Sequence, residues 1–251
     1  MTRGTPLLFP VTESNVVRET LLSAVTAGLV AALALTFMQG VWITPLILQA
    51  ETYEQGEAAS AHDESAGAIH EHHHDVDAWK PQDGLQRTAF TFAANMLMGF
   101  GYAFLLMAIY LLWRQPASAA WGAIYGLAGF VVFFVAPALG LPPELPGTAA
   151  AEVAARQLWW LFIASATAVG LILLFSRVSV WVRLIGLALI VAPHWVPAPQ
   201  PVAAASLAPA ELQSQFRVAT AVCNGAFWLL LGFVSSIAFR KFVAADVRFK
   251  A

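Results

Sequence analysis

The feature that most constrains this sequence is a series of long apolar runs separated by short polar segments. A helix needs about 20 mainly apolar residues to cross the roughly 30 Å hydrocarbon core, because it rises about 1.5 Å per residue. The sequence is 59% hydrophobic and 11% charged, whereas a globular domain has about 25% charged residues. We therefore expect an all-α, polytopic integral membrane protein, folded as a single helical bundle over residues 1–251 in a lipid bilayer.

The apolar runs predict about six transmembrane helices. They lie at Thr20–Thr44, Ala89–Trp113, Ala119–Leu139, Gln157–Phe175, Val178–Ala192 and Phe216–Phe239. The fifth is the weakest because it is short and carries Arg183, so a rival hypothesis has five spans with this segment at the interface. A cleaved signal peptide is an alternative for the first run, but that run continues to Leu48 and favours an uncleaved anchor. Small residues at four-residue spacing predict close helix packing; the pairs are Gly28 with Ala32, Gly99 with Ala103 and Gly122 with Gly126.

The distribution of basic residues predicts the orientation, since Lys and Arg near the spans favour the cytoplasmic side. With six spans and a cytoplasmic N-terminus, nine of the 13 basic residues fall inside and four outside. Five spans would leave six inside and seven outside, which gives no orientation. We expect a multi-pass protein of the bacterial inner (cytoplasmic) membrane, with N- and C-termini in the cytoplasm and residues 49–87 as an extracytoplasmic loop.

This loop is acidic and histidine-rich, with nine of the 15 acidic residues, five of the 6 histidines and two basic residues. Its histidines are His62, His70, His72, His73 and His74. Imidazoles beside carboxylates are typical ligands of divalent transition metals such as cobalt, nickel, zinc and copper. The segment predicts metal capture by flexible ligands, with a low-complexity tract of adventitious affinity as the alternative. Its negative charge excludes nucleic acid as a partner.

Polar residues inside or beside spans are functional candidates, because burying them in hydrocarbon costs free energy. The candidate metal ligands are Glu51, Glu54, Glu144 and His194, and the candidate lining of a translocation path is Gln39, Asn95, Gln157 and Asn224. Glu51 and Glu54 lie one helical turn apart, so both carboxylates can face one cation. The alternative is that these residues join helices or end them in water. No nucleophile-and-base, phosphate-loop or dinucleotide motif occurs, so we do not expect an enzyme.

Several segments together carry a family resemblance. They are Gln39 with Pro45–Glu54 (PLILQAETYE), Pro137–Gly147 (PALGLPPELPG), Arg156–Trp160 (RQLWW) and Pro193-His194. With them, the chain resembles the CbtA family of predicted cobalt transporter subunits. The resemblance implies Co²⁺ as the transported ion, a link to cobalamin supply, and a small single-span, histidine-containing partner subunit (CbtB-like). The residues alone leave nickel or zinc open, because cobalt binds N/O ligands more weakly than nickel or copper.

Two functions fit these observations. The first is a membrane subunit of a cobalt, or divalent transition-metal, uptake transporter that captures the ion at an outer His/Glu-rich loop. The second is a non-transporting scaffold that delivers metal to another translocator. The polar residues inside the spans distinguish them. Convergence of Gln39, Asn95 and Asn224 on one cavity favours transport, whereas separate helix contacts favour the scaffold.

Overall fold

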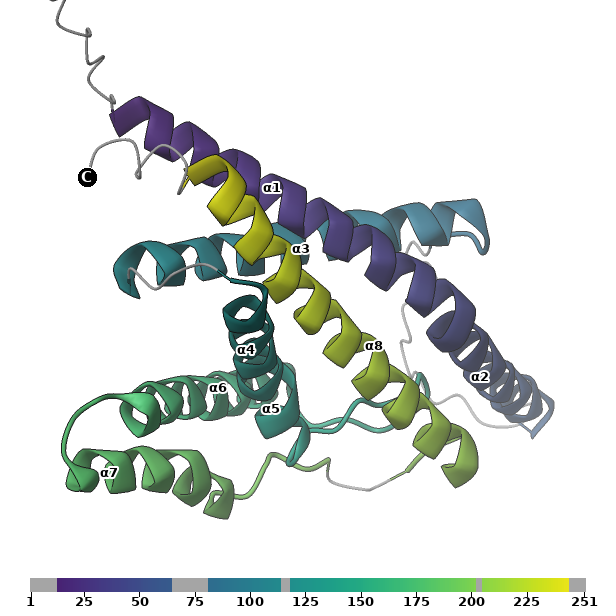
Figure 1. The fold of residues 1–251 in the computed structure, drawn as a ribbon. Helices are drawn as coiled ribbons and strands as arrows, with labels where there is room; N and C mark the ends of the chain where they lie inside the picture. The colour runs from purple at the N-terminus through teal and green to yellow at the C-terminus, as the bar shows by residue number, and fades with distance from the viewer. Residues whose placement is uncertain (1–12, 65–80, 114–117, 202–204, 244–251) are drawn as a thin grey trace, which may run out of the picture.

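The structure, a computed structural model, describes residues 13–64, 81–113, 118–201 and 205–243, and its regular elements there are helices. Figure 1 shows their arrangement. In chain order they are α1 (Glu13–Met38), the π-helix η1 (Gln39–Ile43), α2 (Thr44–Glu64), α3 (Leu85–Trp113), α4 (Ala119–Phe130), the π-helix η2 (Val131–Val135), α5 (Ala136–Ala138), α6 (Val153–Phe175), α7 (Val180–Val191), the 3₁₀-helix η3 (Ala192–Trp195), α8 (Ala210–Ala238) and the π-helix η4 (Phe239–Val243).

Within the described ranges, five helical segments are long and apolar enough to cross a membrane, which confirms the predicted membrane bundle. They are Asn15–Gly56, Leu85–Trp113, Ala119–Ala138, Val153–Phe175 and Ala210–Val243. The expected fifth span is the shorter apolar helix Val180–Trp195. At about 1.5 Å per residue in α7 and 2.0 Å in η3, it covers about 26 Å, slightly less than the hydrocarbon core.

The path of α7 favours six passages over five. It packs antiparallel to α6 (Figure 1) and returns to the start of α6, where Trp159 Nε1 donates to the carbonyl of Val196 at 3.3 Å. The chain entering α8 lies at this end too, because the Leu207 N–H donates to the carbonyl of Gly147 at 3.2 Å. We call this the loop end. At the opposite end η4 packs against α1, so both described chain ends lie there (Figure 1).

Two of the π-helices have a physical cause in a nearby proline. Pro45 follows η1 after one intervening residue, and Pro137 follows η2 at the same spacing. A proline ring clashes with the carbonyl four residues earlier and has no N–H to donate. A wider turn relieves the clash, and the Thr44 N–H then bonds the carbonyl of Gln39, five residues back. Both long helices thus continue past a proline through a π-turn, a frequent site of bending.

Small residues hold the central helices close together. Gly28 of α1 meets the backbone of Gly99 in α3, and Gly126 of α4 meets that of Gly232 in α8. Lipid offers no hydrophobic drive for helix association, so close backbone packing supplies much of the attraction. The main core fills the space among α1, α3, α4 and α8 and includes Trp228, which is 2% exposed.

The α6–α7 hairpin is built in the same way but forms a separate unit. Gly170 of α6 meets the backbone of Gly186 in α7. A second, smaller buried cluster of Ala136, Trp159 and Ile163 connects α6 to α5. The hairpin therefore contacts the rest of the bundle chiefly through η2 and α5, near the loop end.

Helices occupy both ends of the expected loop over residues 49–87. Helix α2 continues to Glu64, and α3 begins at Leu85. The change from apolar to acidic composition marks the end of the apolar stretch but does not end the helix, since Glu, Gln and Ala are good helix formers. Residues 65–80 lie outside the described residues.

The glycine contact between α1 and α3 predicts a position-specific loss of stability. A Cβ at Gly99 would lie 2.8 Å from the backbone oxygen of Gly28, whereas a Cβ at Gly101 would meet nothing within 4 Å. We expect Gly99→Ala to cost about 1–3 kcal/mol through overpacking. Gly101→Ala, on the same helix, should be neutral or slightly stabilising. Thermal unfolding in detergent compares the two, and equal midpoints would contradict this packing.

Candidate functional site

The histidine-rich segment lies mostly beyond what the structure describes. His70, His72, His73 and His74 are outside the described residues, and for His62 only the helical backbone at the end of α2 is described. Among the described side chains, no group of three or more His, Cys, Asp or Glu residues is placed to hold a metal ion. The capture site predicted for this segment therefore stays a prediction.

Two of the predicted path residues meet inside the bundle. Asn95 of α3 is 6% exposed, and its Nδ2 donates to Gln39 Oε1 at 2.6 Å and to Thr36 Oγ1 at 3.0 Å. Gln39 is the first residue of η1, so this polar contact lies at the π-turn of the first long helix. An amide contact of this kind also joins helices in lipid.

The other two path candidates lie elsewhere. The Nδ2 of Asn224 donates to the carbonyl of Thr220, one turn earlier in its own helix, at 3.0 Å. Gln157 is exposed on α6, beside Trp160 and Arg156 in a shallow pocket of about 300 Å³ at the loop end. The structure thus brings Gln39 and Asn95 together and leaves Asn224 and Gln157 apart from them.

Glu51, a predicted metal ligand, is held by an arginine. Both terminal nitrogens of Arg87 lie 3.0 Å from Glu51 Oε1, and one of them lies 3.1 Å from Oε2. Arg87 also pairs with Asp83 at 2.9 Å. A carboxylate bound at both oxygens offers less to a metal ion, and the pair ties the first long helix to the start of α3.

Glu54, one turn after Glu51, contacts a different element. A Cβ at Gly147 would lie 3.0 Å from Glu54 Cγ and 3.3 Å from its Oε1, so the side chain packs against the turn before α6. Gly147 has φ +74°, which strongly favours glycine. The two carboxylates predicted to face one cation therefore have different neighbours.

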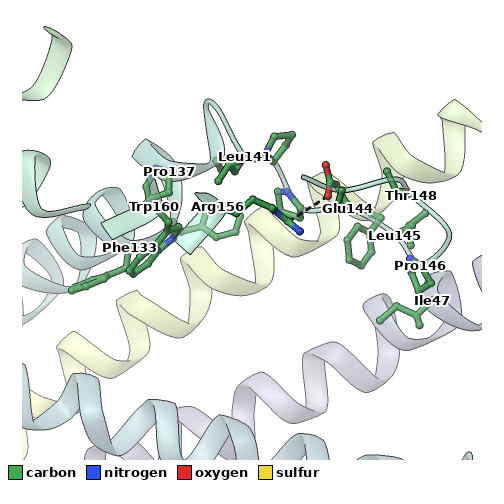
Figure 2. A pocket seen from close by; sticks show the side chains of 16 residues that line it. Ile47, Phe133, Pro137, Leu141, Glu144, Leu145, Pro146, Thr148, Arg156 and Trp160 are labelled. Carbon is green, nitrogen blue, oxygen red and sulfur yellow. Dashed lines mark hydrogen bonds and ion pairs between the residues drawn. The ribbon is translucent and has the colours of Figure 1, made fainter. Parts of the chain in front are cut away.

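The main cavity at the loop end has a volume of about 590 Å³ (Figure 2). Its walls come from α2, η2, α5, the segment between α5 and α6, α6 itself and α8. Apolar side chains dominate them, among them Phe133, Trp160 and Phe216. The charged groups are Glu144 and Arg156, with Arg156 Nη2 3.4 Å from Glu144 Oε2.

A buried glutamine positions the turn that carries Glu144. Gln213 of α8 is 8% exposed, accepts from the Leu145 N–H at 3.1 Å and donates to the Pro143 carbonyl at 3.0 Å. A β-bridge between Thr148 and Ser206 fixes the end of the same turn. Gln213 and Arg156 were not among the predicted site residues. The flanking Pro142-Pro143 pair indicated a turn, but no sequence signal indicated which residue would bind it.

His194 does not line this cavity. It lies half-buried in η3, after the buried Pro193. The structure therefore places Glu144 in the cavity wall and leaves His194 outside it.

These features define a multi-pass membrane protein with a cavity formed where its helices and loop segments meet. The family model for CbtA, the probable cobalt transporter subunit, matches residues 17–240. The match covers the described helical core, so the chain belongs to the CbtA family, as its motifs suggested. No curated protein and no solved structure shows a detectable match to the chain.

The amide contact between α3 and η1 can be tested against a matched position. We expect Asn95→Leu to lower stability by about 0.6–2 kcal/mol, because it removes two hydrogen bonds between helices. Asn224→Leu should cost less, since its amide bonds only its own helix backbone. Denaturant titration of the two variants in detergent measures the difference. A larger loss for Asn224→Leu would show that the Asn95 contact does not join the helices.

Proposed function

We propose that this chain is the membrane subunit of a cobalt uptake transporter, with nickel or zinc as possible further cargo, and that it is not an enzyme. The observation that carries the proposal is the CbtA family match over residues 17–240. The cavity among α2, α5, α6 and α8 supports it, because a ligand-sized space among several helices is a common form of binding site in such bundles. The ion enters from the loop end and leaves toward the end that holds the described chain ends.

We further propose that the loop end faces away from the cytoplasm of a bacterial inner membrane, because nine of the 13 basic residues then lie on the cytoplasmic side. In a Cys223→Ser background, a cysteine at Gln82 should react with a membrane-impermeant maleimide in intact spheroplasts. A cysteine at Ser179, in the α6–α7 turn, should react only after lysis. The reverse pattern would invert the orientation.

Metal capture is assigned to the histidine-rich segment and its carboxylates. Support comes from position, since Glu54, in the middle of α2, and Arg87, near the start of α3, both lie at the loop end. The histidine-rich segment lies between these two residues in the sequence. Ligands on such a segment raise the local metal concentration without fixing a geometry.

A non-transporting scaffold is the second candidate. The separation of Asn224 and Gln157 from the Gln39–Asn95 contact favours it, because the four amides do not line one path. A small, single-span, histidine-containing subunit of the CbtB type reconciles this geometry with transport. In that arrangement the partner supplies the remaining polar wall.

Uptake of radiolabelled Co²⁺ into proteoliposomes tests transport and capture together. We expect uptake by this chain when it is reconstituted with its small partner subunit. Deleting Ala61–Asp75 should raise the half-saturating Co²⁺ concentration several-fold and leave maximal uptake nearly unchanged. Loss of maximal uptake at equal protein level would place the segment in the path itself. No uptake by the intact pair, with retained Co²⁺ binding, would favour the scaffold.

A further inference from the structure

The cavity at the loop end is large for a single metal ion. Its volume is about 590 Å³, whereas a divalent ion with six waters occupies about 180 Å³ at about 30 Å³ per water. Pockets that bind small organic molecules fall between about 300 and 1,000 Å³. By size, the cavity fits an organic ligand.

The cavity wall supplies few metal ligands. Among the described residues, its lining has one carboxylate, Glu144, and no histidine or cysteine, while most of its surface is proline, aliphatic and aromatic. Divalent cobalt needs several nitrogen or oxygen donors, which this wall does not provide. The described wall therefore leaves the remaining donors to water or to a molecule that enters with the metal.

Arg156 adds an electrostatic constraint. Its guanidinium lies 3.4 Å from Glu144, so a bare divalent cation bound to that carboxylate would meet a positive charge at close range. A guanidinium instead favours an anion and binds carboxylates through paired N–H groups. The charged part of the cavity therefore offers one group to a cation and one to an anion.

The Glu144–Arg156 pair is also looser than its counterpart on the first long helix. One contact of 3.4 Å joins it, whereas Arg87 holds both oxygens of Glu51 at 3.0 and 3.1 Å. Charge-assisted bonds are usually about 2.7–2.9 Å long. Among the described residues, the guanidinium of Arg156 makes no other hydrogen bond or ion pair that we observe, so its donors are available to a ligand.

We propose that this cavity binds the divalent metal as its complex with a small carboxylate chelator. Arg156 binds a carboxylate of the chelator, and Glu144 faces the metal and its bound waters. Phe133, Trp160 and Phe216 contact the organic part. The inference rests on the proposed function and specifies the form in which the cargo reaches the cavity.

The experiment separates the chelate from the free ion with citrate as the probe. Radiolabelled Co²⁺ and citrate are raised together so that free Co²⁺ stays constant while the Co²⁺–citrate complex increases. Uptake by the reconstituted protein should then rise and saturate with the complex. Uptake that follows free Co²⁺ alone, unchanged by the complex, would overturn the inference and leave the proposed function intact.

A matched arginine pair identifies the site. Arg156→Gln should weaken the citrate-dependent component about tenfold, as expected for loss of a charge-assisted hydrogen bond of about 1.5 kcal/mol. Arg217→Gln is the control, because Arg217 is exposed near the start of α8, next to Phe216, and does not line the cavity. An equal effect of both substitutions, or higher free Co²⁺ uptake by Arg156→Gln without citrate dependence, would contradict the assignment.

Binding to the purified protein separates failure of this inference from failure of transport. Equilibrium dialysis with labelled Co²⁺ and labelled citrate should show citrate bound only when Co²⁺ is present, and Arg156→Gln should reduce this Co²⁺-dependent citrate binding. Joint binding without uptake would support the cavity site while rejecting transport by this chain. A lack of Co²⁺-dependent citrate binding would reject the cavity site.

Discussion

Close backbone contact between helices is the constraint on which this structure depends. Three helix pairs share it: α1 with α3 at Gly28 and Gly99, α4 with α8 at Gly126 and Gly232, and α6 with α7 at Gly170 and Gly186. Because lipid solvates apolar side chains as well as a protein core does, helices associate through packing and polar contacts. Each pair is tight at its glycines, and the cavity lies where members of the different pairs meet at the loop end.

Prolines shape the turn between α5 and α6, which forms one wall of the cavity at that junction. Pro137 lies in α5, at the end of the third long helical segment, and the chain then turns through Pro142 and Pro143 before α6 begins. Prolines cannot donate hydrogen bonds, so the backbone of this turn depends on outside partners. Gln213 provides two of them from α8. The hydrogen bonds from Gln213 therefore hold this wall of the cavity and give Glu144 a defined position.

Much of the fold followed from apolar run length and small residues. The membrane bundle, the short fifth helix and the close approach at Gly28 and Gly99 were all predicted, since each depends on local composition. The extension of α2 beyond Gly56 was missed. The length of an apolar run indicates only the part of a helix that crosses the membrane, whereas the full length of the helix also depends on the helix propensity of the residues that follow.

The site was less predictable because its contacts are between distant segments. Glu51 and Arg87 are 36 residues apart, and Gln213 binds a turn about 70 residues earlier. The sequence pattern indicates that Glu51 is polar beside a span, but not whether an arginine or a cation neutralises it. Of the four predicted path residues, Gln39 and Asn95 contact each other, and they do so at the π-turn before Pro45.

Selectivity for cobalt has a physical difficulty that the cavity addresses. Nickel and copper bind most nitrogen and oxygen sites more tightly than cobalt, so a site built for affinity alone would hold the wrong ion. A cavity that binds a metal complex selects it by the shape and charge of the whole complex, while the chelator coordinates the metal ion. The ion pair of Glu144 and Arg156 suits such recognition, since it is net neutral and presents both signs of charge within one apolar wall. The cavity would then discriminate among metal complexes by how well their charges match the spacing of Glu144 and Arg156. A complex that leaves either of these charges unpaired in the cavity binds more weakly.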